Sequence, residues 1–295
     1  MGAFEGRTMF ISGGSRGIGE AIAVAAAREG ANVAIAAKTA EPHPKLPGTI
    51  HTAVEAVEAA GGRGLACLCD IRDENQVREA VEKTVEAFGG IDFCVNNASA
   101  IQLTGTAATD VKRYDLMTGI NSRGTFVVTQ ACLPHLLKSD RAHILTMSPP
   151  LDFNPMWFRN HPAYSLAKYG MTILTLAWAA EFEGKIAANC LWPRTPIDTA
   201  AVRNLLGGDA MARQSRTPEI MGDAAAAILK KGVDFTGWCA MDDLMLAGEG
   251  EVDFERYAVT PGGKLQNDFF FPHGTAPAGS KETPVGWRAP KLDPL

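Results

Sequence analysis

Short apolar runs alternate with amphipathic helical patterns from residue 6 to about residue 240. Most of these runs are apolar on both faces, as in parallel strands that helices cover from each side. The expected strands are Arg7–Ser12, Asn32–Ala37, Gly64–Cys69, Ile91–Asn96, His143–Ser148, Ile186–Leu191 and Gly237–Ala240. Their alternation with helices predicts an α/β fold built on a doubly wound parallel sheet with right-handed crossovers.

Several helix boundaries are marked in the sequence. Glycines favour the left-handed residue after a helix, and Asp, Thr and Pro favour the first turn. The glycines expected to end helices are Gly30, Gly61 and Gly89, and the expected starts are Asp73 with Gln76 and Thr217 with Pro218.

Three stretches do not follow the alternation. Lys38–Thr49 is a Pro-rich loop, long enough to suggest a function. Asp198–Ser215 has the weak helical pattern of a mobile lid. Beyond Pro261 the chain is rich in Pro and Gly. We therefore predict one domain over residues 1–260, with a substrate lid near 198–217, and a tail over 261–295. Phe269-Phe270-Phe271 is too apolar to be wholly solvated, so the tail is expected to pack on its own or a neighbouring subunit.

The composition narrows the class of protein. With 46% hydrophobic and 21% charged residues the chain is neither disordered nor a coiled coil. A net charge of −5 gives no bulk attraction for nucleic acid or anionic lipid. The longest apolar stretch, Met171–Ala180, is about half of the roughly 20 residues that span a membrane. No signal layout precedes the first strand, and the six cysteines show no metal-ligand spacing. A cytoplasmic protein with reduced core thiols and no metal is expected.

A glycine-rich segment follows the first predicted strand and opens the first predicted helix. It reads Ser12-Gly13-Gly14-Ser15-Arg16-Gly17-Ile18-Gly19. Glycines there let backbone N–H groups and the helix N-terminus approach a pyrophosphate. An ordinary Gly-rich turn is the alternative, and the strand before and the helix after favour a nucleotide site.

Three further motifs follow along the chain. Asn96-Asn97-Ala98 ends the fourth predicted strand, Asn121-Ser122-Arg123-Gly124 lies on the next helix, and Tyr164-Ser165-Leu166-Ala167-Lys168 opens the helix after the fifth strand. With the glycine segment they resemble the short-chain dehydrogenase/reductase family over residues 6 to about 240. The resemblance implies a Rossmann-type fold, a nicotinamide dinucleotide cofactor and hydride transfer. The residues that it implies for cofactor binding, together with Lys38 discussed below, are Ser12, Gly13, Ser15, Arg16, Gly17, Ile18, Gly19, Asp70, Ile71, Asn97, Ala98, Lys168, Pro193, Ile197 and Thr199.

The four-residue spacing of Tyr164 and Lys168 has a physical interpretation that does not depend on the family resemblance. Residues four apart lie on one helical face, so the Lys168 ammonium can favour the ionised form of the Tyr164 phenol. A surface pair one helical turn apart is the alternative. The resemblance implies that Tyr164 exchanges the carbonyl proton, that Lys168 also holds the nicotinamide ribose and that Asn121 anchors a water of the proton relay.

The charge after the second strand bears on cofactor choice. An acidic residue there would accept hydrogen bonds from the ribose of NAD, whereas the 2′-phosphate of NADP requires a cation. The strand ends Ala36-Ala37-Lys38, and Arg16 offers a planar guanidinium to phosphate oxygens. Solvated surface charges are the alternative. The pair predicts NADP, with NAD as the other candidate.

Two positions depart from the family pattern. The resemblance places the catalytic serine at Pro149, with Ser148 one residue early. Adjacent strand residues face opposite ways, so Ser148 serves only if the Pro149-Pro150 kink turns it inward. Otherwise another donor polarises the carbonyl, or the activity is feeble. Similarly, Pro193-Arg194 stands where the family has Pro-Gly, and Thr199 lies one place further on than usual.

Apolar side chains near the predicted site favour an apolar small-molecule substrate, such as a steroid, a fatty aldehyde or a terpenoid alcohol. Packing in the core or between subunits is the alternative for them. The side chains expected to wall the pocket are Phe153, Met156, Trp157, Phe158, Leu205, Leu206 and Met211.

We therefore predict an NADP(H)-dependent oxidoreductase acting on an apolar carbonyl or alcohol, with Tyr164, Lys168, Asn121 and Ser148 as catalytic residues. Enoyl reduction ranks lower, because family members with that activity space the Tyr and Lys more widely. The alternative of another class is an NADP(H)-binding redox sensor or scaffold without turnover.

A homodimer or homotetramer is also predicted, through the helices expected over Asp110–Leu137 and Ala163–Phe182. Both are apolar on more than one face, and family members pair through them. The side chains that suggest this surface are Leu174, Leu176, Trp178 and Phe182.

Overall fold

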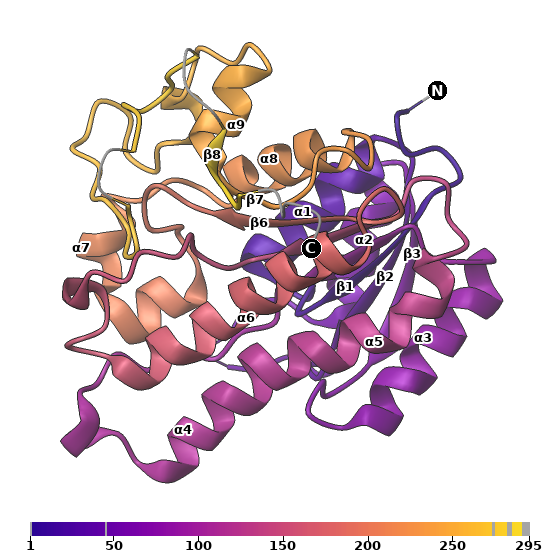
Figure 1. The fold of residues 1–295 in the computed structure, drawn as a ribbon, viewed down its shortest axis with the longest axis horizontal. Helices are drawn as coiled ribbons and strands as arrows, with labels where there is room; N and C mark the ends of the chain where they lie inside the picture. The colour runs from indigo at the N-terminus through magenta and orange to yellow at the C-terminus, as the bar shows by residue number, and fades with distance from the viewer. Residues whose placement is uncertain (1, 45, 273–274, 282–284, 291–295) are drawn as a thin grey trace.

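The computed structural model describes residues 2–44, 46–272, 275–281 and 285–290. Within them one sheet has eight strands in the order β3-β2-β1-β4-β5-β6-β7-β8 (Figure 1). Their bounds are β1 Thr8–Ser12, β2 Asn32–Ala37, β3 Arg63–Leu68, β4 Phe93–Asn96, β5 His143–Thr146, β6 Ala187–Trp192, β7 Trp238–Met241 and β8 Gly286–Arg288. The first seven are parallel, and β8 is antiparallel to β7. The predicted doubly wound fold is confirmed, whereas β8 was not predicted.

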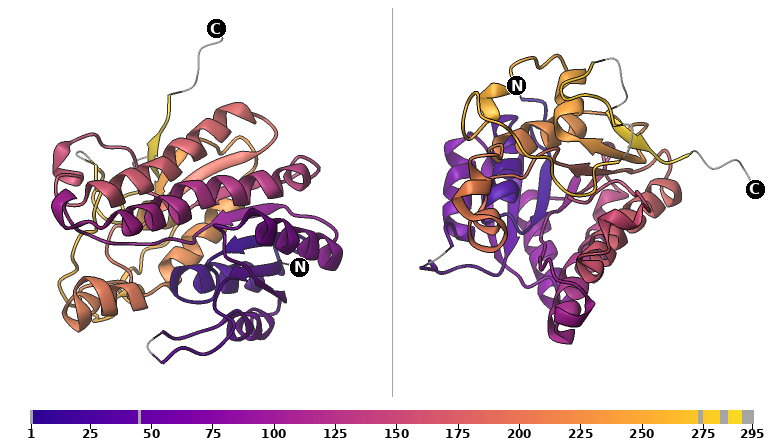
Figure 2. Two further views of the ribbon diagram at one scale, coloured as in Figure 1. Left: turned by 90° about the horizontal axis from the view of Figure 1, so that it is seen from below. Right: turned by 90° about the vertical axis from the view of Figure 1, so that its left-hand side faces the viewer.

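Helices cover both faces of the sheet. On one face α1 packs against α2 and α8, and α8 packs against α9; on the other, α3 packs against α5 and α5 against α6. Figure 2 shows α5 and α6 side by side on their face. The bounds are α1 Gly17–Arg28, α2 Ile50–Ala59, α3 Glu74–Phe88, α4 Val111–Thr118, α5 Gly124–Leu136, α6 Pro162–Glu181, α7 Gly208–Ala212, α8 Glu219–Leu229 and α9 Asp242–Gly248. Two π-helical turns, Gly119–Arg123 and Val202–Leu206, join α4 to α5 and precede α7.

The central strands are buried on both faces, as their apolar runs predict. Met9 and Ile11 of β1 belong to the core under α1 and α8, and Phe10 between them belongs to the core under α3 and α5. All three are fully buried. This alternation follows from the two-residue period of a strand, so no position of β1 faces water.

The predicted helix boundaries agree with the structure. Gly30, Gly61 and Gly89 have positive φ after α1, α2 and α3. The Asp73 side chain accepts hydrogen bonds from the N–H groups of Asn75 and Gln76 and caps α3. The helix α8 begins directly after Pro218.

The described residues of the tail lie on this chain's own domain. The strand β8 extends the sheet beside β7, and the N–H of Ala289 donates to the carbonyl of Gly237 at 3.0 Å. Phe270 is fully buried. Figure 1 shows the tail as the yellow segment that passes α7 and returns to the sheet edge at β8.

Other expectations have mixed outcomes. All six cysteines are free and buried. Among the described residues no helix is long and apolar enough to cross a membrane, and no cluster of His, Cys, Asp or Glu could hold a metal. Of the four side chains expected to form a partner surface, Trp178 is buried, and Leu174 and Phe182 pack against the same core, whereas Leu176 is half-buried outside it. The inward packing of the first three follows from the face that α6 turns to the sheet.

Candidate active site

A groove opens where the strand order reverses, between the carboxyl ends of β1 and β4. In doubly wound folds this switch point is where ligands bind. The cavity measures about 320 Å³ and brings together twelve of the residues predicted for the cofactor. These are Gly13, Ser15, Arg16, Gly17, Ile18, Gly19, Lys38, Asp70, Ile71, Asn97, Ala98 and Thr199. Thr39, Ser99, Ile120, Ala200 and Ala201 also line it and were not predicted.

Close backbone approach explains two glycines of the first motif. A Cβ atom on Gly13 would lie 2.7 Å from the Cα atom of Ala98, and one on Gly19 would lie 2.5 Å from the carbonyl oxygen of Gly13. Both distances are too short for any side chain. The segment therefore folds tightly enough to present its backbone to the groove, as phosphate binding at the start of α1 requires.

Ser12 has a structural role rather than a place in the lining of the groove. Its buried hydroxyl accepts hydrogen bonds from the N–H groups of Asn97 and Ala98 at 3.2 and 3.3 Å. The Asn97 amide donates to the carbonyl oxygens of Ser12 and Gly13. These bonds lock the end of β4 to the glycine segment.

Arg16 and Lys38 stand at the same end of the groove. A terminal nitrogen of Arg16 donates to the carbonyl oxygen of Gly48 at 3.1 Å, so the Pro-rich loop Lys38–Thr49 closes back on the glycine segment. Partial burial lowers the pKa of Arg16, and its Nε is buried without a partner among the described residues. The Lys38 side chain is exposed. Two cations therefore border the groove beside the end of β2.

Asp70 lies at the groove with its carboxylate already paired. Arg72 binds it through its side chain and also through its backbone N–H at 3.1 Å. The hydrogen bonds from Arg72 lower the pKa of Asp70. The residue therefore presents a fixed charge rather than a free carboxylate.

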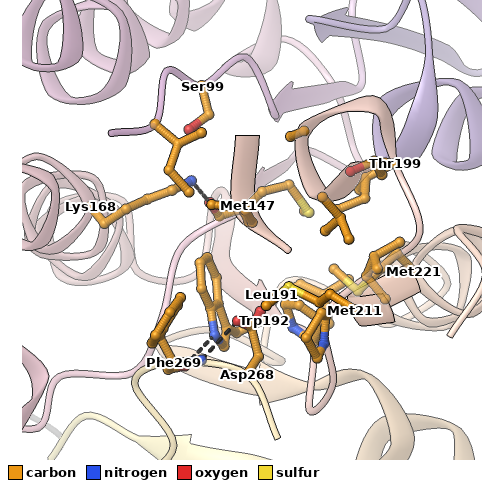
Figure 3. Close-up of a pocket in the computed structure, with 18 of the residues that line it drawn as sticks. Ser99, Met147, Lys168, Leu191, Trp192, Thr199, Met211, Met221, Asp268 and Phe269 are labelled. Carbon is orange, nitrogen blue, oxygen red and sulfur yellow. Dashed lines mark hydrogen bonds between the residues drawn. The ribbon is translucent and has the colours of Figure 1, made fainter. Parts of the chain in front are cut away.

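A second cavity of about 200 Å³ continues from the groove and shares Ile18, Asn97, Ser99, Thr199 and Ala201 with it. It contains the remaining predicted residues of the cofactor and catalytic groups except Ser12, Asn121 and Ser148. Those present are Tyr164, Lys168, Pro193 and Ile197, and Thr199 is shared with the groove. Figure 3 shows the cavity, with Met147, Leu191, Trp192, Met211 and Met221 on its walls.

Tyr164 and Lys168 open into this cavity from one face of α6. Lys168 donates a hydrogen bond to the carbonyl oxygen of Met147 at 2.8 Å, and its Nζ lies 5.4 Å from the centre of the Trp192 ring. Burial lowers the pKa of Lys168 to about 7. Burial and the charge of Asp268 raise the pKa of Tyr164. The phenol is thus protonated at neutral pH in the unliganded protein.

Asn121 lies in neither cavity. It sits on the π-helical turn Gly119–Arg123, and its fully buried side chain makes two hydrogen bonds to the backbone of Ala100, at 2.8 and 3.1 Å. Turns of this kind are frequent at functional sites. Here the Asn121 side chain holds the segment that follows Ala98 against α4 and α5.

Ser148 is also absent from both cavities. It is fully buried near the thiol of Cys190 on the neighbouring strand, and its hydroxyl oxygen has no hydrogen-bond partner among the described residues. The carbonyl of the next residue, Pro149, accepts a hydrogen bond from Thr172 of α6 at 2.7 Å. The Pro149-Pro150 kink is thus tied to α6, and Ser148 does not line the cavity that contains Tyr164.

The lid contributes less to the cavity than the sequence predicts. Leu206 and Met211 line it, as expected. Leu205, Phe153 and Met156 are exposed, and Trp157 and Phe158 pack beside Phe270 in a small core. Those five side chains therefore do not wall the cavity, because the loop before α6 turns them to solvent or into that core.

A further wall comes from the tail. Gln266, Asn267, Asp268 and Phe269 line the same cavity as Tyr164 and Lys168. Sequence reasoning missed all four, because they lie outside the motifs that carry the family resemblance. The signal that could have found them is the run Phe269-Phe270-Phe271 in an otherwise polar segment.

The family model described as "short chain dehydrogenase" matches residues 7–207. The chain belongs to the short-chain dehydrogenase family. This family membership agrees with the four motifs and makes the chain a member of an oxidoreductase family that uses nicotinamide dinucleotides.

Within the family the chain is similar to hydroxysteroid dehydrogenase-like protein 2. It is 58% identical to the Danio rerio protein over 269 residues, which are 91% of this chain and 65% of that protein. The chain thus spans less than two thirds of that relative's length.

Solved structures agree with the fold of this short-chain dehydrogenase. The crystal structure of a protein from Xanthomonas campestris has a TM-score of 0.88 and 56% identity, and covers 92% of this chain and 99% of that one. A short chain dehydrogenase from Mycobacterium paratuberculosis bound to NAD has a TM-score of 0.62 and 26% identity, and covers 75% of this chain and 90% of that one.

Proposed function

We propose that this short-chain dehydrogenase uses NADP(H) to interconvert an apolar carbonyl compound and its alcohol, with Tyr164 as acid and base. The observation that carries the proposal is the continuity of the two cavities. Tyr164 and Lys168 open into a space that shares five lining residues with the glycine-rich groove. A dinucleotide along the groove would bring its nicotinamide to the Tyr164 end.

The cofactor, Tyr164 and Lys168 have separate roles in the proposed reaction. When bound, the cofactor supplies or accepts the hydride at the substrate carbon. In the reducing direction Tyr164 gives its hydroxyl proton to the carbonyl oxygen; in the oxidising direction it takes the alcohol proton. The neighbouring Lys168 favours the anionic form of the phenol that the second direction needs. Ser148 is buried near Cys190 and does not line the cavity, so we assign the polarisation of the carbonyl to Tyr164 and not to Ser148.

NADP is proposed over NAD because of the charges at the end of β2. Arg16 and Lys38 border the groove, and Asp70 is neutralised by Arg72. A 2′-phosphate there would meet two cations and no free carboxylate. NAD remains the rival, since it is the cofactor bound to the relative from Mycobacterium paratuberculosis.

The walls of the inner cavity support an apolar substrate. Met147, Met211 and Met221 are flexible thioether side chains that adapt to irregular apolar shapes. Leu191 and Trp192 complete that side. The substrate is therefore expected to present carbon skeleton to these walls and its carbonyl to Tyr164.

A fluorescence titration of the purified protein with NADPH and NADH tests the proposal first. NADPH is expected to bind more tightly, by about tenfold or more, which corresponds to about 1.4 kcal/mol. Lys38→Asp should remove that preference, and Tyr164→Phe should leave both affinities nearly unchanged. A control substitution, Lys264→Ala in the exposed part of the tail, should change neither affinity.

The same protein is then assayed with aldehydes, ketones and secondary alcohols. Turnover that Tyr164→Phe removes supports the proposal. Tight NADPH binding with no turnover on any compound would favour the non-catalytic redox sensor or scaffold. If neither nucleotide binds, the enzyme hypothesis is wrong.

We also propose that the chain forms a homodimer or homotetramer through the face of α4, α5 and α6. Exposed apolar side chains on this face support it: Val111, Phe126, Leu166 and Ile173 are 71%, 42%, 59% and 53% exposed. Sedimentation should show a species larger than 31.4 kDa at micromolar concentration, and Leu166→Asp should shift it toward the monomer. A wild-type protein that sediments only as a monomer would refute this assignment.

A further inference from the structure

The tail is fixed over the inner cavity by Arg194, which lies in the loop after β6. The N–H of Asp268 donates to the Arg194 carbonyl at 2.8 Å, and the Arg194 guanidinium donates to the carbonyl of Ala276 at 3.0 Å. The guanidinium also lies 4.7 Å from the centre of the Phe271 ring. Asp243 neutralises it in a buried ion pair. Arg194 thus holds three points of the tail, Asp268 through its backbone carbonyl and Phe271 and Ala276 through its side chain.

Phe270 holds the same segment from the other side. It is fully buried and contacts the rings of Tyr164, Tyr169 and Trp192. Its φ of +62° lies in the left-handed region, which costs about 1 kcal/mol or more for a non-glycine residue. Such a conformation persists only when the surroundings enforce it. The tail therefore has a defined path past the cavity.

That path places the carboxyl group of Asp268 on the cavity wall. Its Oδ1 accepts a hydrogen bond from the N–H of Phe269 at 2.8 Å, and the Phe269 carbonyl accepts one from Trp192 at 2.9 Å. No hydrogen bond reaches Oδ2 within the part of the chain that the structure describes. Figure 3 shows Asp268 beside Trp192, among the apolar walls. Oδ2 of Asp268 is thus a hydrogen-bond acceptor without a described partner beside apolar cavity walls.

The charge environment of Asp268 narrows what this acceptor can bind. Burial, together with the nearby Asp242, raises the pKa of Asp268 to about 7, and Lys168 opposes that rise. A substrate carboxylate would be repelled by Asp268, and a substrate ammonium would be repelled by Lys168. A hydroxyl group is neutral, and it can donate to the carboxylate form or exchange hydrogen bonds with the acid form.

We propose that Asp268 is a specificity-determining residue that binds a hydroxyl group of the substrate, at a distance from the carbonyl that reacts at Tyr164. The substrate class is then an apolar carbonyl compound that carries a second, hydroxyl oxygen, or the corresponding diol. The inference rests on the proposed function, because it assigns the substrate of that same cavity.

The test compares matched carbonyl compounds. Each aldehyde or ketone that the wild-type enzyme reduces is assayed beside the same compound with a distant hydroxyl and the same compound with a carboxylate at that position. Medium-chain aldehydes with terminal groups and steroid ketones supply both series. The hydroxyl compound is expected to have the highest kcat/KM, by about tenfold or more, because a site built for a hydroxyl leaves a buried group unpaired when the hydroxyl is missing.

Substitutions of Asp268 test whether this residue causes the difference in kcat/KM between the matched compounds. Asp268→Leu should abolish the advantage of the hydroxyl compound over the plain compound, whatever its effect on kcat/KM for the plain compound. Asp268→Asn keeps an acceptor oxygen and removes the charge, so it should retain the hydroxyl advantage and lose the discrimination against the carboxylate. Asp253→Asn removes an exposed carboxylate elsewhere and should behave as wild type. If Asp268→Leu does not fold, the isosteric Asp268→Asn comparison decides.

The outcomes separate this inference from the proposed function. Turnover by the wild type with equal kcat/KM across each matched set overturns the role of Asp268 and leaves the oxidoreductase assignment intact. A hydroxyl advantage that persists in Asp268→Leu also overturns it. Binding of NADPH without turnover of any compound contradicts the proposed function, and the inference falls with it.

Discussion

The ammonium group of Lys168 donates a hydrogen bond to the carbonyl oxygen of Met147, 2.8 Å away, directly before the Ser148-Pro149-Pro150 kink. The end of β5 is thereby tied to the face of α6 that carries Tyr164 and Lys168. Thr172 makes a second tie from the same helix to Pro149. The Pro149-Pro150 kink is thus fixed by the helix that carries Tyr164.

Lys168→Met should stabilise the unliganded protein and abolish turnover. Burial lowers the pKa of Lys168 from its ordinary 10.5 to about 7, so the native state binds fewer protons than the unfolded state between these values. The loss of folding stability caused by burying the charged amine is therefore complete below pH 7. It decreases as the pH rises toward 10.5. Removing the buried amine should raise the free energy of unfolding at pH 6 by about 2 kcal/mol.

Urea unfolding of wild type and Lys168→Met from pH 6 to pH 10 measures this effect. The difference in the free energy of unfolding should shrink as the pH rises. A difference that stays constant with pH would show that Lys168 is not buried as a charged group.

Tyr164→Phe should lower kcat by about 10³, because the variant lacks the proton that the carbonyl oxygen receives. Burial raises the pKa of Tyr164, so the wild-type group is protonated across the neutral range. Single-turnover kinetics with a reducible aldehyde measure the chemical step. Tyr169→Phe is the matched control, since the Tyr169 hydroxyl donates to the carbonyl of Asp152 outside the cavity. Equal loss in both variants would argue against a specific role of Tyr164.

Gly48→Ala should weaken NADPH binding. Gly48 has a φ of +76°, and a Cβ atom there would lie 2.4 Å from the carbonyl oxygen of Ser15. The clash must displace the loop that Arg16 holds at Gly48, so the cation beside the 2′-phosphate moves. We expect about a tenfold loss of NADPH affinity and a smaller loss of NADH affinity, measured by fluorescence titration.

Gly61→Ala provides the control for that variant. Gly61 also has a positive φ, and nothing lies within 4 Å of a Cβ atom built there. It should lose about 1 kcal/mol of stability and bind NADPH as wild type does. Matching losses of affinity in the two alanine variants would mean that backbone strain, and not the contact with Ser15, is responsible.

Arg194→Ala should destabilise the protein by about 3 kcal/mol, because it leaves the buried Asp243 carboxylate without its cation. It should also release the tail, which limited proteolysis followed by mass spectrometry would detect as new cleavage between residues 261 and 281. The double variant Arg194→Met/Asp243→Leu removes both charges. It should recover stability but not the protection of the tail; full protection would show that Arg194 is not the anchor.

Much of the nucleotide site could be predicted because its signals are local. A strand, a glycine turn and a helix follow one another in the chain, so Gly13, Arg16 and Gly19 are placed by their neighbours. The pairing of Tyr164 with Lys168 requires only the helical period. These predictions place the residues correctly without knowledge of what packs against them.

The sequence by itself determined that the sheet is doubly wound, that a glycine-rich turn follows its first strand, and that Tyr164 and Lys168 share a helical face, because periodicity and backbone geometry act over a few residues. Only the tertiary structure decided that Ser148 is buried near Cys190 and that Asp268 enters the cavity. The direction of a side chain at a proline kink depends on what packs around it. The path of an aperiodic tail depends on contacts with residues more than seventy positions away, of which Arg194 and Trp192 are the decisive ones.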